Sequence, residues 1–490
     1  MICISINQES RRLALVDMLN AARQCDLLEI RLDRFGKAPE IAELMTHKPK
    51  PVIMACRRPQ DGGFFDGTEP ERLAILRQCI ISKADYVEIE LDAADDIRRF
   101  PPSQRVISYT NLRETPVDIL DIYEEAKTKS PDVIKLTTLA RTPEEAWPLV
   151  QILAKATVPT VVVGLGKPGI MLTLLGQRIG APWTYAALER GMEAYPGQPT
   201  VGDLESVYHL HKIDKQTRFV GVTGFEDRAT IAVAALNAAL AHHQLNFRCL
   251  PMGVGNMKLF RKVMEAVKLG AAVIDPEHQR DILEIGPELH GTAKTVGAVD
   301  LLIQKQNAWH GFHCASQAWM EALTATLRQK FSVENPIKDR MVMIAGLTPA
   351  TKILATEVQR LGGNAILASH QKKAALALAQ ELSCRAIGFD ALYTTMHDVL
   401  ILCDEERQSS GRDAGIHPGY FKPGMVVMDL TATAGSSQLL IDAQVRNCLT
   451  VDPLQLLLAR LGAQAKLLTG KPTPDDVLRQ AIPERFLEVG

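Results

Sequence analysis

The sequence has no charge excess and no long apolar run. Its 490 residues include 55 Lys and Arg against 57 Asp and Glu, so the formal net charge is −2. This balance gives no electrostatic reason to expect nucleic acid or an anionic membrane as a partner. No apolar run reaches the roughly 18 residues that span a bilayer. The first residues, MICISINQES, are not a basic segment followed by an apolar one. We therefore expect neither a membrane protein nor a secreted one.

The sequence also lacks any Cys-x-x-Cys motif, and its nine cysteines are widely spaced. This pattern is typical of reduced thiols in a cytoplasmic protein, and it predicts neither a disulfide framework nor a zinc site. We therefore expect a cytoplasmic chain without a bound metal. Apolar residues (46%) and charged residues (23%) occur in the proportions of globular protein. At ~150 residues per domain, the length predicts two to four domains.

Short β-branched runs alternate with helical segments over the first 210 residues. In the helical segments, such as 11–23 and 70–82, apolar residues recur at spacings of three and four. Strand followed by helix, eight times over, predicts a (β/α)8 barrel. The expected strands are 2–6, 27–33, 51–57, 86–91, 105–110, 133–138, 160–166 and 184–188.

Charged residues lie at the C-terminal ends of these expected strands, where a barrel places its active site. Charges on strands buried on both faces are costly unless they are paired. We therefore expect them to converge at one mouth and to bind a small anionic substrate, although any single one could be a structural ion pair. The residues are Glu29, Arg31, Asp33, Arg57, Glu88, Glu90 and Lys135.

Lys135 stands in the otherwise apolar strand segment VIKLTT. A neutral amine in such a place can attack a ketone and form a Schiff base. The alternative is a lysine whose stem is buried and whose ammonium reaches water at the rim. Position alone leaves both readings open.

Seven short segments of this region resemble, in order and spacing, type I 3-dehydroquinate dehydratase. They are EIRLD (29–33), CRRPQDGG (56–63), VEIELD (87–92), SYTNLRETP (108–116), DVIKL (132–136), GLGKPG (164–169) and YPGQPT (195–200). In that family a lysine forms an imine with the substrate ketone, and dehydroquinate then loses water to give dehydroshikimate. The resemblance implies that Lys135 forms the imine and that Glu90 orients the family's acid–base histidine. It implies that Glu29, Arg31, Arg57 and Gln198 bind the substrate.

Three parts of the family pattern, which comprise four residues, are changed. Thr110 replaces the acid–base histidine, Leu172 and Thr173 replace a Ser-Arg pair that clamps the substrate carboxylate, and Ala194 replaces a serine. Loss of a positioned acid–base group typically costs about 10²–10⁴ in rate. We expect a slow dehydratase of the shikimate pathway. The alternatives are a non-catalytic scaffold or sensor that binds a dehydroquinate-like acid, and an imine-forming enzyme for another keto acid.

A second α/β pattern begins near residue 214. Strand-like runs, among them 219–223, 341–346 and 425–430, alternate with helices and predict a two-lobed module with a Rossmann-like half. We expect a barrel over 1–213, a substrate domain over 214–330 and a Rossmann-like domain over 331–490. In a dinucleotide site, glycines let the backbone of this turn approach the pyrophosphate closely. The turn AGLTPAT (345–351) has one glycine, and it has a proline where that close approach would occur.

The order of these elements resembles shikimate dehydrogenase, through segments such as GVTGFEDR (221–228), VIDPEH (273–278) and GFHCAS (311–316). The family's functional residues are replaced. His278 stands for the catalytic lysine, Ala315 for its aspartate, Ala432 for a tyrosine and Arg460 for a substrate glutamine. We expect a retained scaffold without hydride transfer, no cofactor, and no favoured binding of NADP. A genuinely bifunctional enzyme is the alternative, and a homodimer is compatible with the sequence.

Overall fold

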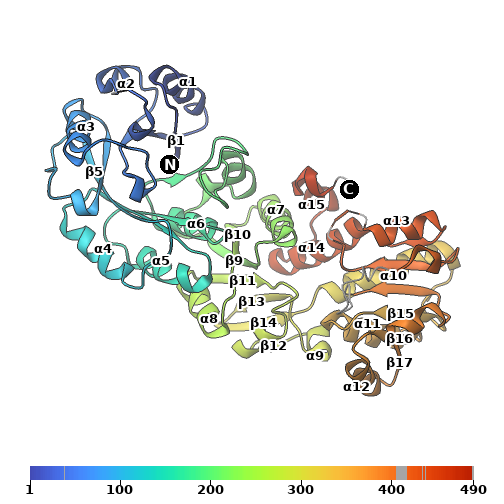
Figure 1. Ribbon diagram of the computed structural model, residues 1–490. Helices are drawn as coiled ribbons and strands as arrows, with labels where there is room; N and C mark the ends of the chain where they lie inside the picture. The colour runs from blue at the N-terminus through green and yellow to red at the C-terminus, as the bar shows by residue number, and fades with distance from the viewer. Residues whose placement is uncertain (38, 404–415, 433, 436, 488–490) are drawn as a thin grey trace. The chain divides into compact units, whose positions relative to one another are not determined.

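The structure is a computed structural model that describes residues 1–37, 39–403, 416–432, 434–435 and 437–487 (Figure 1). The chain divides into two compact units. One comprises Met1–Phe225 and Asn246–Gly270, and the other Glu226–Leu245 and Ala271–Gly490. Among the described residues, no helix has the length and apolarity to cross a membrane. The domain boundaries expected after residues 213 and 330 stay predictions.

The first unit contains the predicted barrel, an eight-stranded sheet in the order β7-β6-β5-β4-β3-β2-β1-β8. Neighbours follow the chain except that β8 pairs with β1, and every pairing is parallel, so the sheet curls almost into a closed ring. The strands are β1 (Ile2–Ile6), β2 (Leu27–Arg31), β3 (Val52–Ala55), β4 (Tyr86–Glu90), β5 (Gln104–Asn111), β6 (Val133–Leu139), β7 (Thr160–Leu165) and β8 (Thr184–Tyr185).

Six helices lie around this sheet (Figure 1). They are α1 (Arg11–Ala21), α2 (Ile41–His47), α3 (Glu69–Ile81), α4 (Ile119–Thr128), α5 (Pro143–Lys155) and α6 (Gly169–Ile179). Capping hydrogen bonds explain where two of these helices begin. The Ser10 hydroxyl accepts a hydrogen bond from the Leu13 N–H at the start of α1, and the Glu71 carboxylate accepts one from the Thr68 N–H at the start of α3. The predicted helices 11–23 and 70–82 are confirmed, with ends shifted by one or two residues.

Several strands end earlier than the apolar pattern predicts. The run 27–33 stops as a strand at Arg31 and continues as a short 3-10 helix, Leu32–Arg34. The run 51–57 stops at Ala55, and 184–188 stops at Tyr185. Charged residues at these ends therefore stand on or just beyond the strands, where the chain turns away from the barrel.

The first unit also holds the parallel pair β9 (Arg218–Thr223) and β10 (Phe247–Met252), followed by α8 (Met257–Ala266). In the second unit, β11 (Leu269–Val273), β13 (Leu301–Lys305) and β14 (Ala308–Phe312) pair antiparallel, and β12 (Glu288–Leu289) pairs parallel with β14. The turn between β13 and β14 is Gln306–Asn307, both with positive φ, as a tight hairpin requires.

The predicted Rossmann-like half is confirmed by a six-stranded parallel sheet, ordered β17-β16-β15-β18-β19-β20. The order reverses beside β15, as in a doubly wound fold. The strands are β15 (Met341–Ala345), β16 (Asn364–Ser369), β17 (Arg385–Gly388), β18 (Val399–Leu402), β19 (Val426–Asp429) and β20 (Leu449–Thr450). Helices of this unit are α7 (Asp227–His242), α9 (Thr292–Val296), α10 (Ala315–Phe331), α11 (Pro349–Arg360), α12 (Lys372–Leu382), α13 (Gln438–Val445), α14 (Pro453–Thr469) and α15 (Asp475–Ala481).

Candidate active site

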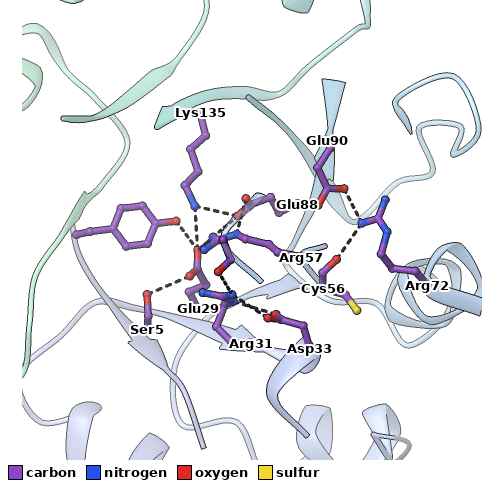
Figure 2. Close-up of polar contacts among 12 residues, drawn as sticks. Ser5, Glu29, Arg31, Asp33, Cys56, Arg57, Arg72, Glu88, Glu90 and Lys135 are labelled. Atoms are coloured by element: carbon purple, nitrogen blue, oxygen red, sulfur yellow. Dashed lines mark hydrogen bonds and ion pairs between the residues drawn. The ribbon is translucent and has the colours of Figure 1, made fainter. Parts of the chain in front are cut away.

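Four charged side chains from four neighbouring parts of the barrel meet at one point (Figure 2). Lys135 Nζ lies 3.1 Å from Glu29 Oε2 and 3.0 Å from Glu88 Oε2. Arg57 Nη2 lies 2.6 Å from the same Glu29 oxygen and 2.8 Å from the same Glu88 oxygen. Glu29 comes from β2, Arg57 follows β3, Glu88 comes from β4 and Lys135 from β6. We call these four residues the charge cluster.

The charge cluster is buried, and its formal charges cancel. The side chains of Glu29 and Glu88 are 1% and 2% exposed, and that of Lys135 is 5% exposed. Burial alone raises the pKa of each carboxyl, but Arg57 and Lys135 outweigh it, so the pKa of Glu29 lies well below its usual value and that of Glu88 is also lowered. Both carboxylates are therefore ionised at neutral pH, and they hold the Lys135 nitrogen in place by ion pairs.

Tyr185 and Ser5 hold the Glu29 carboxylate in place. The Tyr185 hydroxyl donates to Glu29 Oε2 at 2.7 Å, and the Ser5 hydroxyl donates to Glu29 Oε1 at 3.0 Å. The Lys135 ammonium also lies 4.6 Å from the centre of the Tyr185 ring, in cation–π range. Burial raises the pKa of Tyr185, so its hydroxyl stays a donor. Sequence reasoning missed Tyr185, although a polar-tipped aromatic at the end of β8 was a usable signal.

Arg31 contacts Asp33 rather than Lys135. Its guanidinium donates to both Asp33 oxygens, at 2.9 and 2.8 Å, and to the Gly62 carbonyl at 3.0 Å. Gly62 has φ +74°, a conformation that favours glycine. At Gly63 a Cβ atom would lie 1.9 Å from the Arg57 carbonyl oxygen. The two glycines after β3 thus let the loop close tightly against both arginines.

Glu90 lies at the level of Lys135 but has a different partner. In the sheet register Glu90 pairs with Ser108, and Ser108 with Lys135, so the three point to one face. The Glu90 carboxylate nevertheless accepts from Arg72 Nη1 at 2.6 Å (Figure 2). Arg72 comes from α3, is fully buried, and also donates to the Cys56 carbonyl. Sequence reasoning missed Arg72, since its place in an ordinary helical pattern gave no signal.

Burial raises the pKa of Glu90 from 4.5 to about 7, against the opposing effect of Arg72. A folded state with a raised carboxyl pKa binds more protons than the unfolded chain between these two values, so stability falls as pH rises through that window. We expect this site to cost about 3 kcal/mol of unfolding free energy between pH 4.5 and 7. Urea denaturation of wild type and Glu90→Gln at pH 5, 6, 7 and 8 measures the effect. Equal pH slopes for the two proteins would contradict it.

The remaining predicted barrel residues lie at the rim. Thr110 follows Ser108 by two residues and lines a cavity of about 370 Å³ with Glu90 and Asp61. Gln198 lines another, of about 520 Å³, that also reaches Ser5, and its side-chain oxygen accepts from the Ala194 N–H at 2.7 Å. The structure therefore brings Glu29, Arg57 and Lys135 into direct contact, and leaves Arg31, Glu90 and Gln198 with other partners.

In the second unit, the replaced positions do not form an acid–base pair with one another. His278 Nδ1 lies 2.9 Å from both oxygens of Asp275, its neighbour in sequence. Ala315 begins α10, and its N–H donates to the Asp300 carboxylate at 2.8 Å. Pro349 begins α11, directly after β15, and so removes one backbone donor from that helix start.

The fold and the site thus define a (β/α)8 barrel protein with a buried lysine, joined to a Rossmann-like module. The type I 3-dehydroquinase family profile matches residues 2–215. The 3-dehydroquinate dehydratase of Methanopyrus kandleri is 31% identical over 191 residues, which are 38% of this chain and 87% of that protein. The dehydratase of Methanothermobacter thermautotrophicus is 35% identical over 183 residues, covering 36% and 80%. The chain belongs to the type I 3-dehydroquinase family.

Similarity extends beyond the barrel. The bifunctional 3-dehydroquinate dehydratase/shikimate dehydrogenase of Arabidopsis thaliana chloroplasts is 24% identical over 479 residues, covering 93% of this chain and 79% of that protein. The solved dehydroquinate dehydratase and shikimate dehydrogenase from S. pombe covers 98% of both chains at 17% identity, with a TM-score of 0.44. The similarity to the Arabidopsis thaliana protein thus covers the second unit as well as the barrel.

Proposed function

We propose that the barrel converts 3-dehydroquinate to 3-dehydroshikimate through a Schiff base on Lys135. The observation that carries this proposal is a buried amine held within 3.1 Å of two ionised carboxylates, Glu29 and Glu88. The two carboxylates fix the position of the Lys135 nitrogen, and once its proton has passed to solvent the free amine is a nucleophile. The substrate is a carboxylate, and we assign its binding to Arg31, Arg57, Glu29 and Gln198.

In the proposed reaction, the Lys135 nitrogen attacks the ketone carbon, and the carbonyl oxygen leaves as water. The imine then draws electrons from the adjacent carbon, which loses a proton. The hydroxyl on the next carbon leaves with a proton as a second water, and a double bond forms. Hydrolysis of the imine consumes one water and frees the amine, so the net change is the loss of one water.

Borohydride trapping tests the proposal. Reduction of the imine by borohydride attaches the bound keto acid to the protein through a stable secondary amine. We expect intact-mass measurement to show one adduct per chain when 3-dehydroquinate and borohydride are both present, and none when either is left out. An unchanged mass at saturating substrate would contradict the Schiff base.

We expect dehydration to be slow and Thr110→His to accelerate it about tenfold, which corresponds to roughly 1.4 kcal/mol of barrier. An imidazole at position 110 would share a cavity with Glu90 and Asp61, two carboxylates that can orient a proton-transferring base. Steady-state dehydration rates of the two proteins measure the gain, with Thr110→Asn as a polar control that cannot transfer protons. A correctly folded Thr110→His protein with no gain would contradict the assignment.

We further propose that the second module has lost hydride transfer and has no nicotinamide cofactor. The methyl side chain of Ala315 cannot form a hydrogen bond with a catalytic base. Pro349 has no backbone N–H, so the start of α11 offers one hydrogen-bond donor fewer to a pyrophosphate. Isothermal titration with NADP is expected to give no heat above background, and shikimate with NADP to give no absorbance at the reduced-nicotinamide band. Micromolar binding, about −8 kcal/mol, together with turnover would instead establish a bifunctional enzyme.

A second candidate is a scaffold or sensor that binds a dehydroquinate-like acid without turning it over. Thr110, Leu172 and Thr173 favour it, because the positions for proton transfer and carboxylate clamping carry other side chains. Saturable binding of dehydroquinate without any trapped adduct would support it over the dehydratase.

For both candidates we propose a cytoplasmic protein with reduced thiols and a small anionic ligand. We propose no nucleic-acid or membrane partner, and a homodimer is compatible with either candidate.

A further inference from the structure

The second unit contains a cavity of about 130 Å³ into which two arginines project. Arg228 comes from the first turn of α7 and Arg460 from the middle of α14. The start of α11, at Thr348 and Pro349, and the side chains of Trp319, Leu456 and Leu457 complete much of the wall. The cavity thus combines two cations with an apolar side.

Arg460 has no partner among the residues that the structure describes. Its Nε is enclosed and makes no hydrogen bond, and none of its nitrogens takes part in an ion pair there. Burial lowers the pKa of Arg460, although the carboxylate of Asp300 opposes the shift. Arg460 is half-buried, and an enclosed guanidinium nitrogen without an acceptor costs free energy that an acceptor from solution would recover.

Arg228 is only partly satisfied. One of its terminal nitrogens, Nη2, donates to the carbonyl oxygens of Leu430 at 2.9 Å and Thr431 at 2.7 Å. Burial lowers the pKa of Arg228, and the charge of Arg460 lowers it further, so the two guanidinium groups are close enough to repel each other.

The two nearby carboxylates, Asp429 and Asp300, form hydrogen bonds with other groups. Asp429 lines the cavity, but its oxygens accept from the Thr431 N–H, the Thr431 hydroxyl and the Ser437 hydroxyl. Asp300 accepts from the backbone N–H groups of Cys314 and Ala315, at the start of α10. Neither carboxylate forms an ion pair with Arg228 or Arg460 in the described part of the chain.

We propose that this cavity binds a compact oxyanion, a phosphate or carboxylate group, between Arg228 and Arg460. Guanidinium groups present paired donors that match the oxygens of such groups. This assigns the second module a ligand without any redox chemistry, and it does not depend on dehydration in the barrel.

Isothermal titration of the full chain tests the proposal, with inorganic phosphate in one series and succinate in another. We expect saturable binding in wild type, and Arg460→Gln or Arg228→Gln to weaken it at least tenfold. Arg280→Gln removes an exposed arginine of the same unit and is expected to change nothing. Binding of phosphate alone, succinate alone or both identifies the oxyanion. Any binding in the barrel is unaffected by these variants, so the difference from wild type reports on the cavity.

A second variant separates binding from folding. Because Arg460 has no partner to lose, Arg460→Met is expected to raise the melting temperature in anion-free buffer, and to remove the further rise that phosphate or succinate gives to wild type. The dehydratase rate is expected to stay at the wild-type value. The proposal is overturned if neither anion binds, or if both arginine-to-glutamine variants bind with wild-type affinity.

Discussion

Replacing Lys135 with methionine is expected to abolish the borohydride adduct and to lower the dehydration rate by about 10⁴-fold or more, as removal of a covalent nucleophile does. Methionine keeps an unbranched apolar stem of similar length, so packing around β6 changes little. The ammonium that contacts Glu29 and Glu88 is lost, while Arg57 still contacts both carboxylates. Intact mass after reduction and single-turnover assays with 3-dehydroquinate measure the two effects.

Lys155→Met provides the matched control, since Lys155 is exposed at the end of α5. It should trap substrate and turn over as wild type does. Circular dichroism spectra of both variants confirm that the barrel is folded. A Lys135→Met protein that still forms the adduct would place the imine on another amine and would remove the central assignment.

Arg57→Met is expected to destabilise the barrel by about 3–5 kcal/mol, the usual cost of leaving a buried charge without its partner. Arg57 is the group that lowers the pKa of Glu29 and of Glu88 most. Without it the two carboxylates face each other with only Lys135 between them. Urea denaturation at pH 7 measures the loss, and the turnover rate is expected to fall with it.

The pH dependence distinguishes this cause from a packing defect. A carboxyl with a lowered folded pKa contributes stability above its unfolded pKa, about 4.5 here, and loses it as pH falls through the folded value. The penalty of Arg57→Met is therefore expected to be largest at neutral pH and to shrink below about pH 4. Arg141→Met, which removes an exposed, solvent-screened pair with Glu145, should change stability little at any of these pH values. A penalty that does not change with pH would point to packing instead.

Much of the fold could be predicted because local pattern and tertiary structure agree. β1 was predicted with its observed bounds, and the alternation of strands and helices identified both the barrel and the Rossmann-like half. The β13–β14 hairpin was missed because its turn, Gln306–Asn307, contains no glycine to mark it. Strand ends were overestimated where apolar residues continue into loops, as at Leu32.

The candidate site was predictable in part. The positions of Glu29, Arg57 and Lys135 at strand ends indicated that they converge, and in the structure Glu29 contacts both Arg57 and Lys135. Strand ends could not show that Arg72, which comes from a helix, forms an ion pair with Glu90 and not with Glu88. The hydrogen bond from the Tyr185 hydroxyl to Glu29 likewise depends on the pairing of β8 with β1. Residue spacing in the sequence does not predict that pairing.

The charge cluster also acts as a check on correct folding. Its four members come from separate segments, and a slip of one residue in β6 would turn Lys135 to the opposite face and strand two carboxylates in the core. Barrels with strands in the wrong register are thus destabilised by the charges that the native register pairs. In a refolding mixture, the fraction of chains that borohydride can label with substrate would count the molecules whose strands have all found their native partners.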